Sequence, residues 1–215
     1  MSGMMLNIAG GSFAPAGPTV IGEAFGGGFY AGQIGVSSVA THYLVVGPVA
    51  SAESASKKWK NVNTATPDAD SDIDGPQNTS DMVADGNSTV YPAAHFCNDL
   101  VIGGFSDWYM PAKNELEVCY YNLKPTTTSN ITSVGTNTNA VPSRVSNYTT
   151  GNPAQTSATD FRDTGAEDFT ANRYWSSTES SAAYAWEQTF SNGGQNYAYP
   201  KSYSRRVRAI RRVAA

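Results

Sequence analysis

Residues 103–123 read GGFSDWYMPAKNELEVCYYNL and contain the clearest amphipathic helix in the chain. Apolar side chains recur there at the spacing i, i+3, i+4 and i+7, which places them on one face of a helix. They are Leu116, Cys119, Tyr120 and Leu123. The polar side chains Lys113, Asn114 and Glu117 are expected to point away from this face. A helix with a single apolar face requires a second element to cover it.

A second helix is predicted just upstream, over residues 92–100. Gly103 and Gly104 can adopt the left-handed conformation that commonly closes a helix. Pro92 suits a first helical turn, where its missing N–H would have no partner anyway. We therefore expect two short helices that pack against each other through their apolar faces. The apolar side chains of the upstream helix repeat the same spacing and are Ala93, Phe96, Cys97 and Leu100.

The two cysteines of the chain, Cys97 and Cys119, each lie on one of these apolar faces. Free cysteine behaves as a small hydrophobic side chain, so two buried thiols are favoured. A disulfide between the two helices is the alternative. Neither cysteine has metal-like spacing, and with only His42 and His95 in the chain a structural zinc site is not expected.

The surface is predicted to be polar but weakly charged. Of the 215 residues, 15% are charged, against about 25% in an average globular protein, and Ser, Thr, Asn and Gly take their place. The net charge of −4 argues against general nucleic-acid binding. No apolar run approaches the ~18 to 20 residues of a membrane span, so no membrane insertion is expected. The first residues lack the basic and apolar segments of a signal peptide, and none is expected.

The sequence is interpreted as an arm followed by one domain. Residues 1–28 are rich in Gly, Ala and Pro and predict an N-terminal arm that is either flexible or ordered against a neighbouring subunit. Residues 29–215 are predicted to form the domain. Within it, residues 125–168 show no sustained periodicity and predict a long loop insertion, with Tyr148 and Phe161 as its anchors.

Strands are predicted on both sides of the helices. Residues 29–34 and 42–48 can pair as a hairpin. Residues 51–60 suggest a helical turn. The expected fold class is α+β, with two short helices packed on small antiparallel sheets and many loops. The C-terminal third contains four more predicted strands, at residues 174–177, 184–190, 195–199 and 205–213, with the turn signal Asn192-Gly193-Gly194 between the second and the third.

One stretch has the residue types of a calcium site. Residues 67–81 read PDADSDIDGPQNTSD, in which carboxylates alternate before a glycine and another follows at the twelfth position. Hard oxygen ligands at this spacing can wrap Ca²⁺. A solvated acidic loop or turn is the alternative and is favoured, because no flanking helices are evident. The candidate ligands are Asp70, Asp72, Asp74 and Asp81.

The chain between residues 180 and 204 is rich in Tyr, Asn, Gln and Ser. This mixture is typical of antibody paratopes, where rigid aromatic rings supply contact area and short polar groups supply adaptable hydrogen bonds. An ordinary amphipathic hairpin with aromatic residues in the core is the alternative, and Tyr184, Trp186, Gln188 and Phe190 are expected on one face of the strand. The candidate binding residues are Tyr184, Trp186, Gln188, Asn192, Gln195, Asn196, Tyr197, Tyr199, Lys201 and Tyr203.

The last predicted strand is strongly basic. Its arginines are expected to pair with the acidic excess elsewhere in the chain and to shield a sheet edge or a subunit interface. Contact with phosphate groups is the less favoured interpretation. The arginines are Arg205, Arg206, Arg208, Arg211 and Arg212.

Three separated motifs together resemble a known family. GGFSDWYMPAKNEL at residues 103–116, YWSST at 174–178 and RVRAIR at 206–211 resemble, in this order, the bacterial and phage C-type lectin-like domains found in tail-fibre adhesins. That group is related in fold to the formylglycine-generating enzymes and to the hypervariable phage tropism determinants. The resemblance covers roughly residues 29–215. It departs at Ala112, where such domains usually place Thr or Ser, so the helix start must be held by other groups. These groups are Asn114, Glu115 or neighbouring packed side chains.

The resemblance implies a C-type lectin-like fold and a phage virion protein at a tail tip or fibre end. It implies that the C-terminal hairpin binds a host-surface receptor, a protein or a glycan, and that the chain forms a homo-oligomer, most simply a trimer. Residues 1–28 would attach it to other virion proteins. A structural decoration or fibre-joining subunit without a host ligand is the alternative hypothesis. No enzymatic activity and no cofactor other than the candidate calcium ion are expected, since the paired active cysteines of formylglycine-generating enzymes have no counterpart at recognisable positions.

Overall fold

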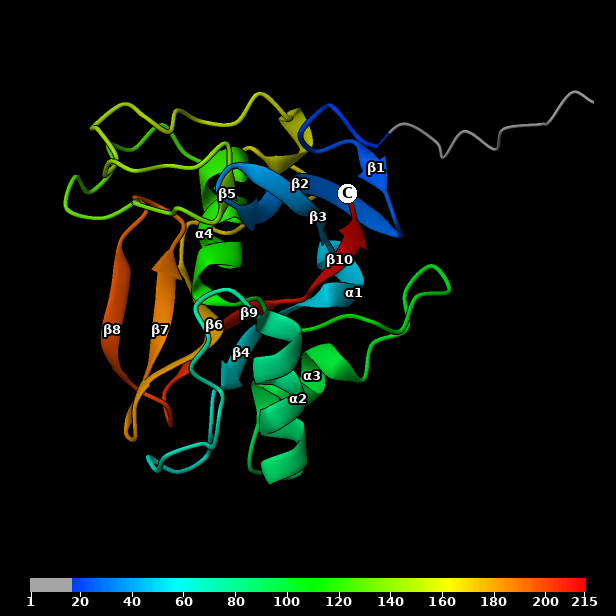
Figure 1. The fold of residues 1–215 in the computed structure, drawn as a ribbon, viewed down its shortest axis with the longest axis vertical. Helices are drawn as coiled ribbons and strands as arrows, with labels where there is room; N and C mark the ends of the chain where they lie inside the picture. Colours follow the sequence, from blue (N-terminus) through cyan, green and yellow to red (C-terminus); the bar gives the residue numbers. More distant parts are fainter. Residues whose placement is uncertain (1–16) are drawn as a thin grey trace, which may run out of the picture.

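Two five-stranded sheets form the frame of the fold (Figure 1). The computed structural model describes residues 17–215. The first sheet has the order β1-β2-β3-β10 with β5 added beside β2, and its pairs are antiparallel. Its strands are β1 (Ala24–Phe25), β2 (Gly28–Val36), β3 (Val39–Val46), β5 (Ala140–Val141) and β10 (Ile210–Ala214).

The second sheet has the order β4-β9-β6-β7-β8. Its pairs are antiparallel except that β6 and β9 pair in parallel at Tyr174 and Arg206. The predicted strand 205–213 is thus divided at Ala209, and its two halves belong to different sheets. The α+β class is confirmed. The strands of this sheet are β4 (Glu53–Lys58), β6 (Arg173–Ser181), β7 (Tyr184–Thr189), β8 (Gln195–Pro200) and β9 (Ser204–Arg208).

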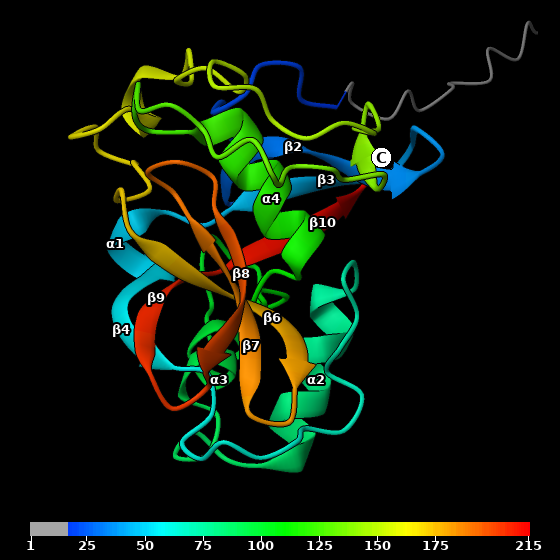
Figure 2. The ribbon, with the colours of Figure 1, turned by 90° about the vertical axis from the view of Figure 1, so that its left-hand side faces the viewer.

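Helices lie on both sides of this frame. Figure 2 shows α4 beside the first sheet and α2 and α3 at the opposite end of the molecule. None of the helices between residues 17 and 215 combines the length and the apolar character needed to cross a bilayer. The helical elements are α1 (Val49–Ala52), α2 (Gly75–Asp85), α3 (Pro92–Asn98), α4 (Lys113–Leu123) and the 3₁₀ turn η1 (Thr159–Phe161).

The predicted helices α3 and α4 form, but the expectation that they pack against each other is wrong. The apolar face of α4 lies in one core cluster, with Ala31, Ile34 and Leu44 of the first sheet. Cys97 of α3 lies in a second cluster, around Trp59 and Trp175. The stretch between the helices carries the chain from one cluster to the other and pairs with β10 on the way, so each helix finds a different partner.

Because the helices are separated, Cys97 and Cys119 do not form a disulfide. Both thiols are free and fully buried, which confirms the favoured interpretation. Burial raises the pKa of each thiol far above its usual value, because the thiolate would have no water around it. Such thiols are chemically inert packing groups.

The start of α4 is held without a side-chain cap at Ala112. The Glu115 carboxylate reaches back and accepts a hydrogen bond from the Ala112 N–H at 2.8 Å. The Lys113 N–H donates to Thr178 Oγ1 at 3.0 Å. The expectation that Glu115 helps to hold the helix start is confirmed. Thr178 of β6 and the Asp72 carbonyl, which accepts from the Asn114 N–H at 2.9 Å, supply further acceptors.

Two elements differ from the prediction in type. Residues 75–85, placed partly in an acidic loop, form helix α2, with Asp74 at its N-cap and Pro76 in its first turn. Residues 53–58, expected to contain a helical turn, form the edge strand β4. Both segments are polar, so neither shows the apolar periodicity on which the assignment depends.

The domain begins earlier than residue 29. Ile21 packs against the first core cluster, and β1 pairs with β2 through a turn at Gly26 and Gly27, both in the left-handed region at φ 56° and 83°. Residues 17–28 are therefore part of the domain, and the predicted arm boundary at residue 28 is wrong. The rest of the predicted arm, residues 1–16, lies outside the described part of the chain.

The predicted insertion, residues 125–168, covers the outer side of α4 (Figures 1 and 2). Its expected anchors are confirmed, since Phe161 and Tyr148 are buried. A further anchor was not expected: Glu117 of α4 points inward and is fully buried. Its carboxylate accepts hydrogen bonds from the Tyr148 hydroxyl and the Asn137 amide at 2.6 Å each, and it pairs with Arg144.

This arrangement predicts that Glu117 holds the insertion in place. Substitution of Glu117→Ala leaves Arg144 and two polar side chains buried without their acceptor, so it is expected to lower the free energy of unfolding by about 3–5 kcal/mol. Urea denaturation followed by tryptophan fluorescence measures the loss. The control is Asp163→Ala, an exposed carboxylate of the same insertion, for which a change within about 0.5 kcal/mol is expected. Equal effects of the two substitutions would contradict the proposed anchor.

Candidate functional site

The candidate hairpin is formed by β7 and β8, and β8 is the edge strand of the second sheet. The predicted turn is confirmed: Gly193 has φ 77°, and its N–H donates to the Thr189 carbonyl at 2.8 Å. One irregularity shapes the hairpin. Ala185 pairs with Tyr199 and Glu187 with Asn196, so β8 carries one residue more than β7 between these pairs. This bulge decides which side chains of β8 share a face with those of β7.

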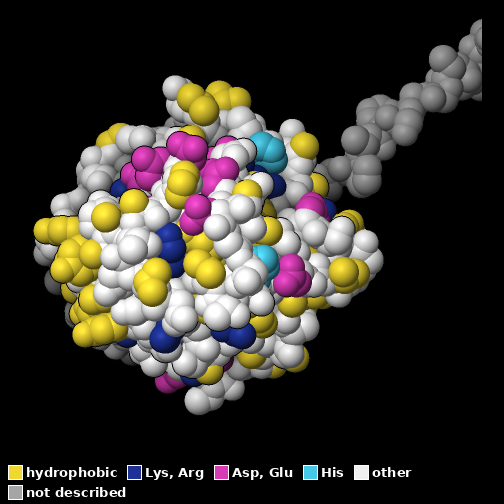
Figure 3. All heavy atoms as spheres, turned by 90° about the horizontal axis from the view of Figure 1, so that it is seen from below, with side chains coloured by type: hydrophobic (Ala, Val, Ile, Leu, Met, Phe, Trp, Pro, Cys, Tyr) yellow, Lys and Arg dark blue, Asp and Glu magenta, His cyan; other side chains and the backbone are white. Residues whose placement is uncertain are grey.

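Three aromatic side chains share one face of the hairpin, and we call them the aromatic surface: Tyr184, Trp186 and Tyr197. Tyr197 is 62% exposed and Tyr184 39% exposed, while Trp186 is half-buried. The rings of Trp186 and Tyr197 lie 5.4 Å apart at an angle of 55°. Viewed from below in Figure 3, hydrophobic side chains gather on the left, the side on which β7 and β8 lie in Figure 1.

A cation packs against the Trp186 ring and helps to hold it in place. The Lys113 ammonium lies 4.5 Å from the centre of the ring and forms an ion pair with Asp72 at 2.7 Å. A cation over an indole face is a favourable contact of about 0.5–1 kcal/mol where it is exposed to water. The start of α4 and the loop before α2 therefore help to orient the aromatic surface.

The opposite face of the hairpin carries a different set of side chains. The Tyr199 ring has the guanidinium groups of Arg173 and Arg205 at 4.6 Å each, and Arg205 also approaches the ring of Tyr203. Both arginines pair with Glu187, whose carboxylate is fully buried. Burial raises the pKa of Glu187, and the two arginines oppose this effect. The candidate residues Tyr199 and Tyr203 thus belong to another surface than Tyr197.

Two candidate binding residues are not accessible. Gln188 is 2% exposed, and its amide donates to the Gly193 carbonyl inside the turn. Lys201 is fully buried, where it pairs with Glu179 at 2.9 Å and lies over the Trp59 ring. Their assignment to a receptor surface is wrong. The sequence does not indicate that Lys201 is internal. A lysine is seldom buried without a partner, and its partner here, Glu179, is distant in the sequence.

The polar candidates near the turn are only partly accessible. The Ile131 N–H donates to the Asn192 carbonyl at 2.9 Å, and the Asn192 side chain accepts from the Gly194 N–H. Gln195 pairs with Gln188, and both Gln195 and Asn196 are half-buried. The single continuous surface expected from residues 184–203 is therefore divided into two faces and an interior. The expected face of Tyr184, Trp186, Gln188 and Phe190 does form. One end of it lies in the core, where the Phe190 ring packs at 4.9 Å on Tyr174, the cross-strand partner of Gln188, so only Tyr184 and part of Trp186 reach the surface.

The C-terminal arginines pair with carboxylates, as expected. Each of the five has its own acidic partner, and several of these pairs are largely buried. The pairs are Arg205–Glu187, Arg206–Glu53, Arg208–Glu167, Arg211–Asp107 and Arg212–Glu115.

Three of the four candidate calcium ligands have other roles in the structure, and the fourth, Asp70, is exposed. Asp74 caps α2, Asp72 pairs with Lys113, and Asp81 lies inside α2, where it accepts from Gln77. Between residues 17 and 215, no group of three or more carboxylate, imidazole or thiol side chains comes together around one point. A calcium loop requires its twelfth residue to fold back onto the first ones, and the helix prevents this for Asp81.

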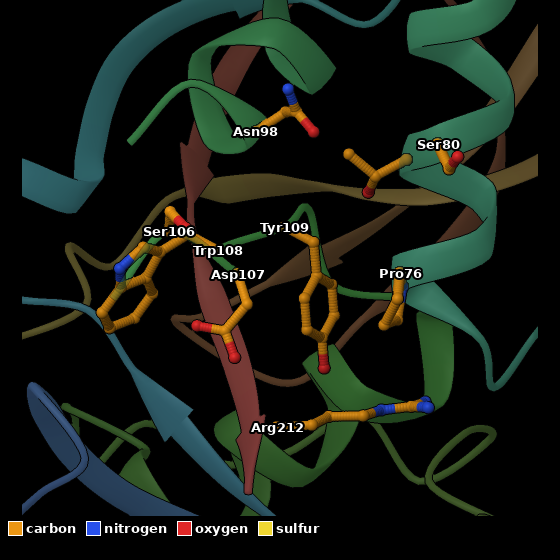
Figure 4. Close-up of a pocket in the computed structure, with 9 residues that line it drawn as sticks. Pro76, Ser80, Asn98, Ser106, Asp107, Trp108, Tyr109 and Arg212 are labelled. Carbon is orange, nitrogen blue, oxygen red and sulfur yellow. The ribbon is translucent and has the colours of Figure 1, made fainter. Parts of the chain in front are cut away.

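A pocket of about 260 Å³ lies between α2, α3 and the segment 106–109 (Figure 4). Tyr109 stands in its centre, with Pro76 on one side and Asp107 on the other. Arg212 closes one end, where its Nε donates to Glu115 at 2.7 Å. The sequence does not reveal this pocket, because its residues come from four separate segments.

The walls of the pocket are fixed by charged pairs. Both oxygens of Asp107 accept from Arg211, at 2.7 and 2.9 Å, and this pairing lowers the pKa of the Asp107 carboxyl. Arg211 in turn lies 3.8 Å from the centre of the Phe105 ring. The Tyr109 hydroxyl donates to Glu115 at 2.6 Å, and burial raises the pKa of both groups. These contacts leave the pocket walls with little freedom to move.

Comparison with known proteins gives one family match. The sequence model of the Lcl C-terminal domain family matches residues 56–211, which is more than half of the chain. Among solved structures, the chain is similar to a fimbrial protein from Bacteroides ovatus ATCC 8483, with a TM-score of 0.44 and 14% identity. That similarity covers 80% of this chain and 36% of the fimbrial protein, so the chain spans little more than a third of its length. A comparison with curated proteins found no match.

The pocket wall yields a prediction on pH. Because the Arg211 hydrogen bonds lower the pKa of Asp107, the pair stabilises the fold above the carboxyl's unfolded-state pKa of about 3.9 and loses this effect as the pH falls through the lower folded-state pKa. The difference in unfolding free energy between wild type and Asp107→Asn is therefore expected to be largest above about pH 4 and to shrink as the pH falls below this value.

Urea unfolding at intervals over this range measures the difference. Asp163→Asn is the control, since its exposed carboxylate makes no side-chain hydrogen bond within residues 17–215 and should give a pH-independent difference near zero. A constant difference for Asp107→Asn would show that the ion pair does not contribute in solution.

Proposed function

The chain belongs to the Lcl C-terminal domain family, and we propose that it is an adhesin-like domain that binds a host-cell receptor through the aromatic surface of its C-terminal hairpin. The family match supports the adhesin-like character. The receptor-binding role is our proposal.

The exposure of Tyr184 and Tyr197 beside Trp186 is the observation that carries this proposal. Aromatic rings of this kind are usually buried, and those on a surface are enriched at binding sites, where Trp and Tyr supply much of the affinity. Each ring has only two rotatable side-chain bonds, so little entropy is lost when it is immobilised. The Lys113 ammonium holds Trp186 before any ligand arrives.

We place the domain at the tip of a phage tail or fibre, on a particle assembled in the cytoplasm. The order of the three sequence motifs and a short helix enclosed by twisted sheets support a C-type lectin-like arrangement. A homotrimer attached through the N-terminal residues would present the aromatic surface in several copies. Linked copies gain avidity without new contacts, which suits a surface of modest area.

Binding, not catalysis, is the proposed activity. The two thiols are buried, and their raised pKa keeps them protonated and unreactive. Most charged side chains of the interior are engaged in ion pairs that hold the sheets and the insertion together. The buried Lys124 ammonium instead donates to the carbonyls of Thr128 and Pro153 and to the amide oxygen of Asn130. The arrangement of these charged side chains is explained by their role in stabilising the fold.

The test separates the two faces of the hairpin. The variant Tyr184→Ala/Tyr197→Ala removes the exposed rings of the aromatic surface, and Tyr203→Ala removes a similarly exposed tyrosine on the opposite face. The fluorescently labelled full chain is titrated against a panel of bacterial strains, and bound protein is measured by flow cytometry. The double variant is expected to bind the responsive strains about 30-fold or more weakly, as the loss of a hot spot worth roughly 2 kcal/mol requires, while Tyr203→Ala binds normally.

Equal binding by the double variant and wild type would contradict the proposal. Equal loss in both variants would assign binding to the whole hairpin and not to one face. Circular dichroism and thermal unfolding of each variant serve as folding controls, and exposed substitutions of this kind are expected to change the unfolding free energy by about 0.5 kcal/mol or less.

A further inference from the structure

We propose that the pocket between α2, α3 and segment 106–109 binds a single neutral sugar residue at the end of a glycan. This site is separate from the aromatic surface, and its assignment does not depend on the proposed receptor. It lies among residues of α2, α3, β10 and the 106–109 segment (Figure 4).

The size of the pocket fits one ring. Its volume of about 260 Å³ is slightly below the roughly 300–1,000 Å³ of pockets that take drug-sized ligands. A disaccharide or a peptide segment would extend out of it. A terminal monosaccharide can enter while the remainder of a chain stays in solvent.

Hydrogen-bonding groups at the rim are available to a ligand. The hydroxyls of Ser80 and Ser106 and the amide oxygen of Asn98 make no hydrogen bond to another group within residues 17–215, and all three side chains are exposed. Hydroxyl groups donate and accept, and the amide oxygen accepts. A ligand that carries several hydroxyl groups can satisfy all three, whereas an apolar ligand would leave them without partners.

The wall of the pocket offers apolar surface between these groups. Pro76 is half-buried and faces the cavity beside Tyr109, of which only 4% is exposed, and Asn98 and Ser80 lie at one end of it (Figure 4). A sugar ring has the same mixed character, with C–H groups on its faces and hydroxyls around its edge. The pocket is therefore complementary to it in the distribution of polar and apolar atoms.

The charges at the site favour a neutral ligand. Arg212 is compensated by Glu115 and by Asp74 at 3.5 Å, and Asp107 is compensated by Arg211. Each charge already has a partner, so neither a free cation nor a free anion is offered to the ligand. An acidic sugar would find no unpaired cation here to offset the loss of hydration of its carboxylate.

The experiment follows the backbone and side-chain amides of the full chain by NMR during titration. The probes are the methyl glycosides of glucose, galactose, mannose and N-acetylglucosamine, with glucuronate and glucosamine as charged counterparts of glucose. At least one neutral sugar is expected to give saturable shifts at Ser80, Asn98 and Ser106, with Kd on the order of 1 mM, as expected of a ligand with so few atoms. The acidic counterpart is expected to bind more weakly than glucose wherever glucose itself binds.

Asn98→Ala/Ser106→Ala is expected to weaken the responsive sugar at least tenfold. Both side chains are exposed, so the variant should retain the wild-type spectrum elsewhere. The matched control Tyr184→Ala/Tyr197→Ala should bind the sugar as the wild type does, so failure of the receptor proposal and failure of this one are distinguishable. Three results would overturn the proposal. One is the absence of saturable shifts with all four neutral sugars, and another is unchanged affinity in Asn98→Ala/Ser106→Ala. The third is binding of glucuronate or glucosamine that is tighter than the binding of every neutral sugar.

Discussion

The position of the Glu115 carboxylate constrains most of this fold. It is fully buried, and it accepts hydrogen bonds from the Ala112 N–H, the Tyr109 hydroxyl and the Arg212 guanidinium. A buried charge is tolerated only when such partners surround it. These three partners come from the start of α4, the preceding segment and the last strand. Because Arg212 also approaches Asp74 at the N-cap of α2, the same network fixes that helix. Both the pocket and the support of Trp186 are built on elements that meet here.

The sequence predicts elements well where apolar periodicity is strong. Helix α4, helix α3 and the hairpin turn at Gly193 follow directly from spacing and turn chemistry. Helix α2 is not predicted in this way, because two polar side chains share its buried side with Met82. Asn78 and Thr79 are buried there through hydrogen bonds to Ser71, Ser177 and Met110, which are distant in the sequence or lie in a loop. The helix is stabilised by its cap and by these tertiary contacts, and not by an apolar stripe.

The candidate site could be predicted only in part, for two physical reasons. One extra residue in β8 changes the face on which each later side chain lies, and a bulge leaves no clear mark in a sequence. Glu117 and Lys201 were expected to be accessible, yet both are interior and paired. The composition did indicate that Tyr184, Tyr197 and Tyr203 are exposed, because aromatic residues set among short polar ones are typical of binding loops.

We propose that the exposed aromatic surface recognises a foreign surface and that the inner charged pairs support the hairpin. Electron cryomicroscopy of the proposed phage particle tests this assignment most directly. We expect Tyr184, Trp186 and Tyr197 to point outward into solvent at the distal end of the assembly, with the N-terminal residues directed toward the particle. Burial of these three side chains against neighbouring subunits would contradict the account and would favour a joining or decorating subunit.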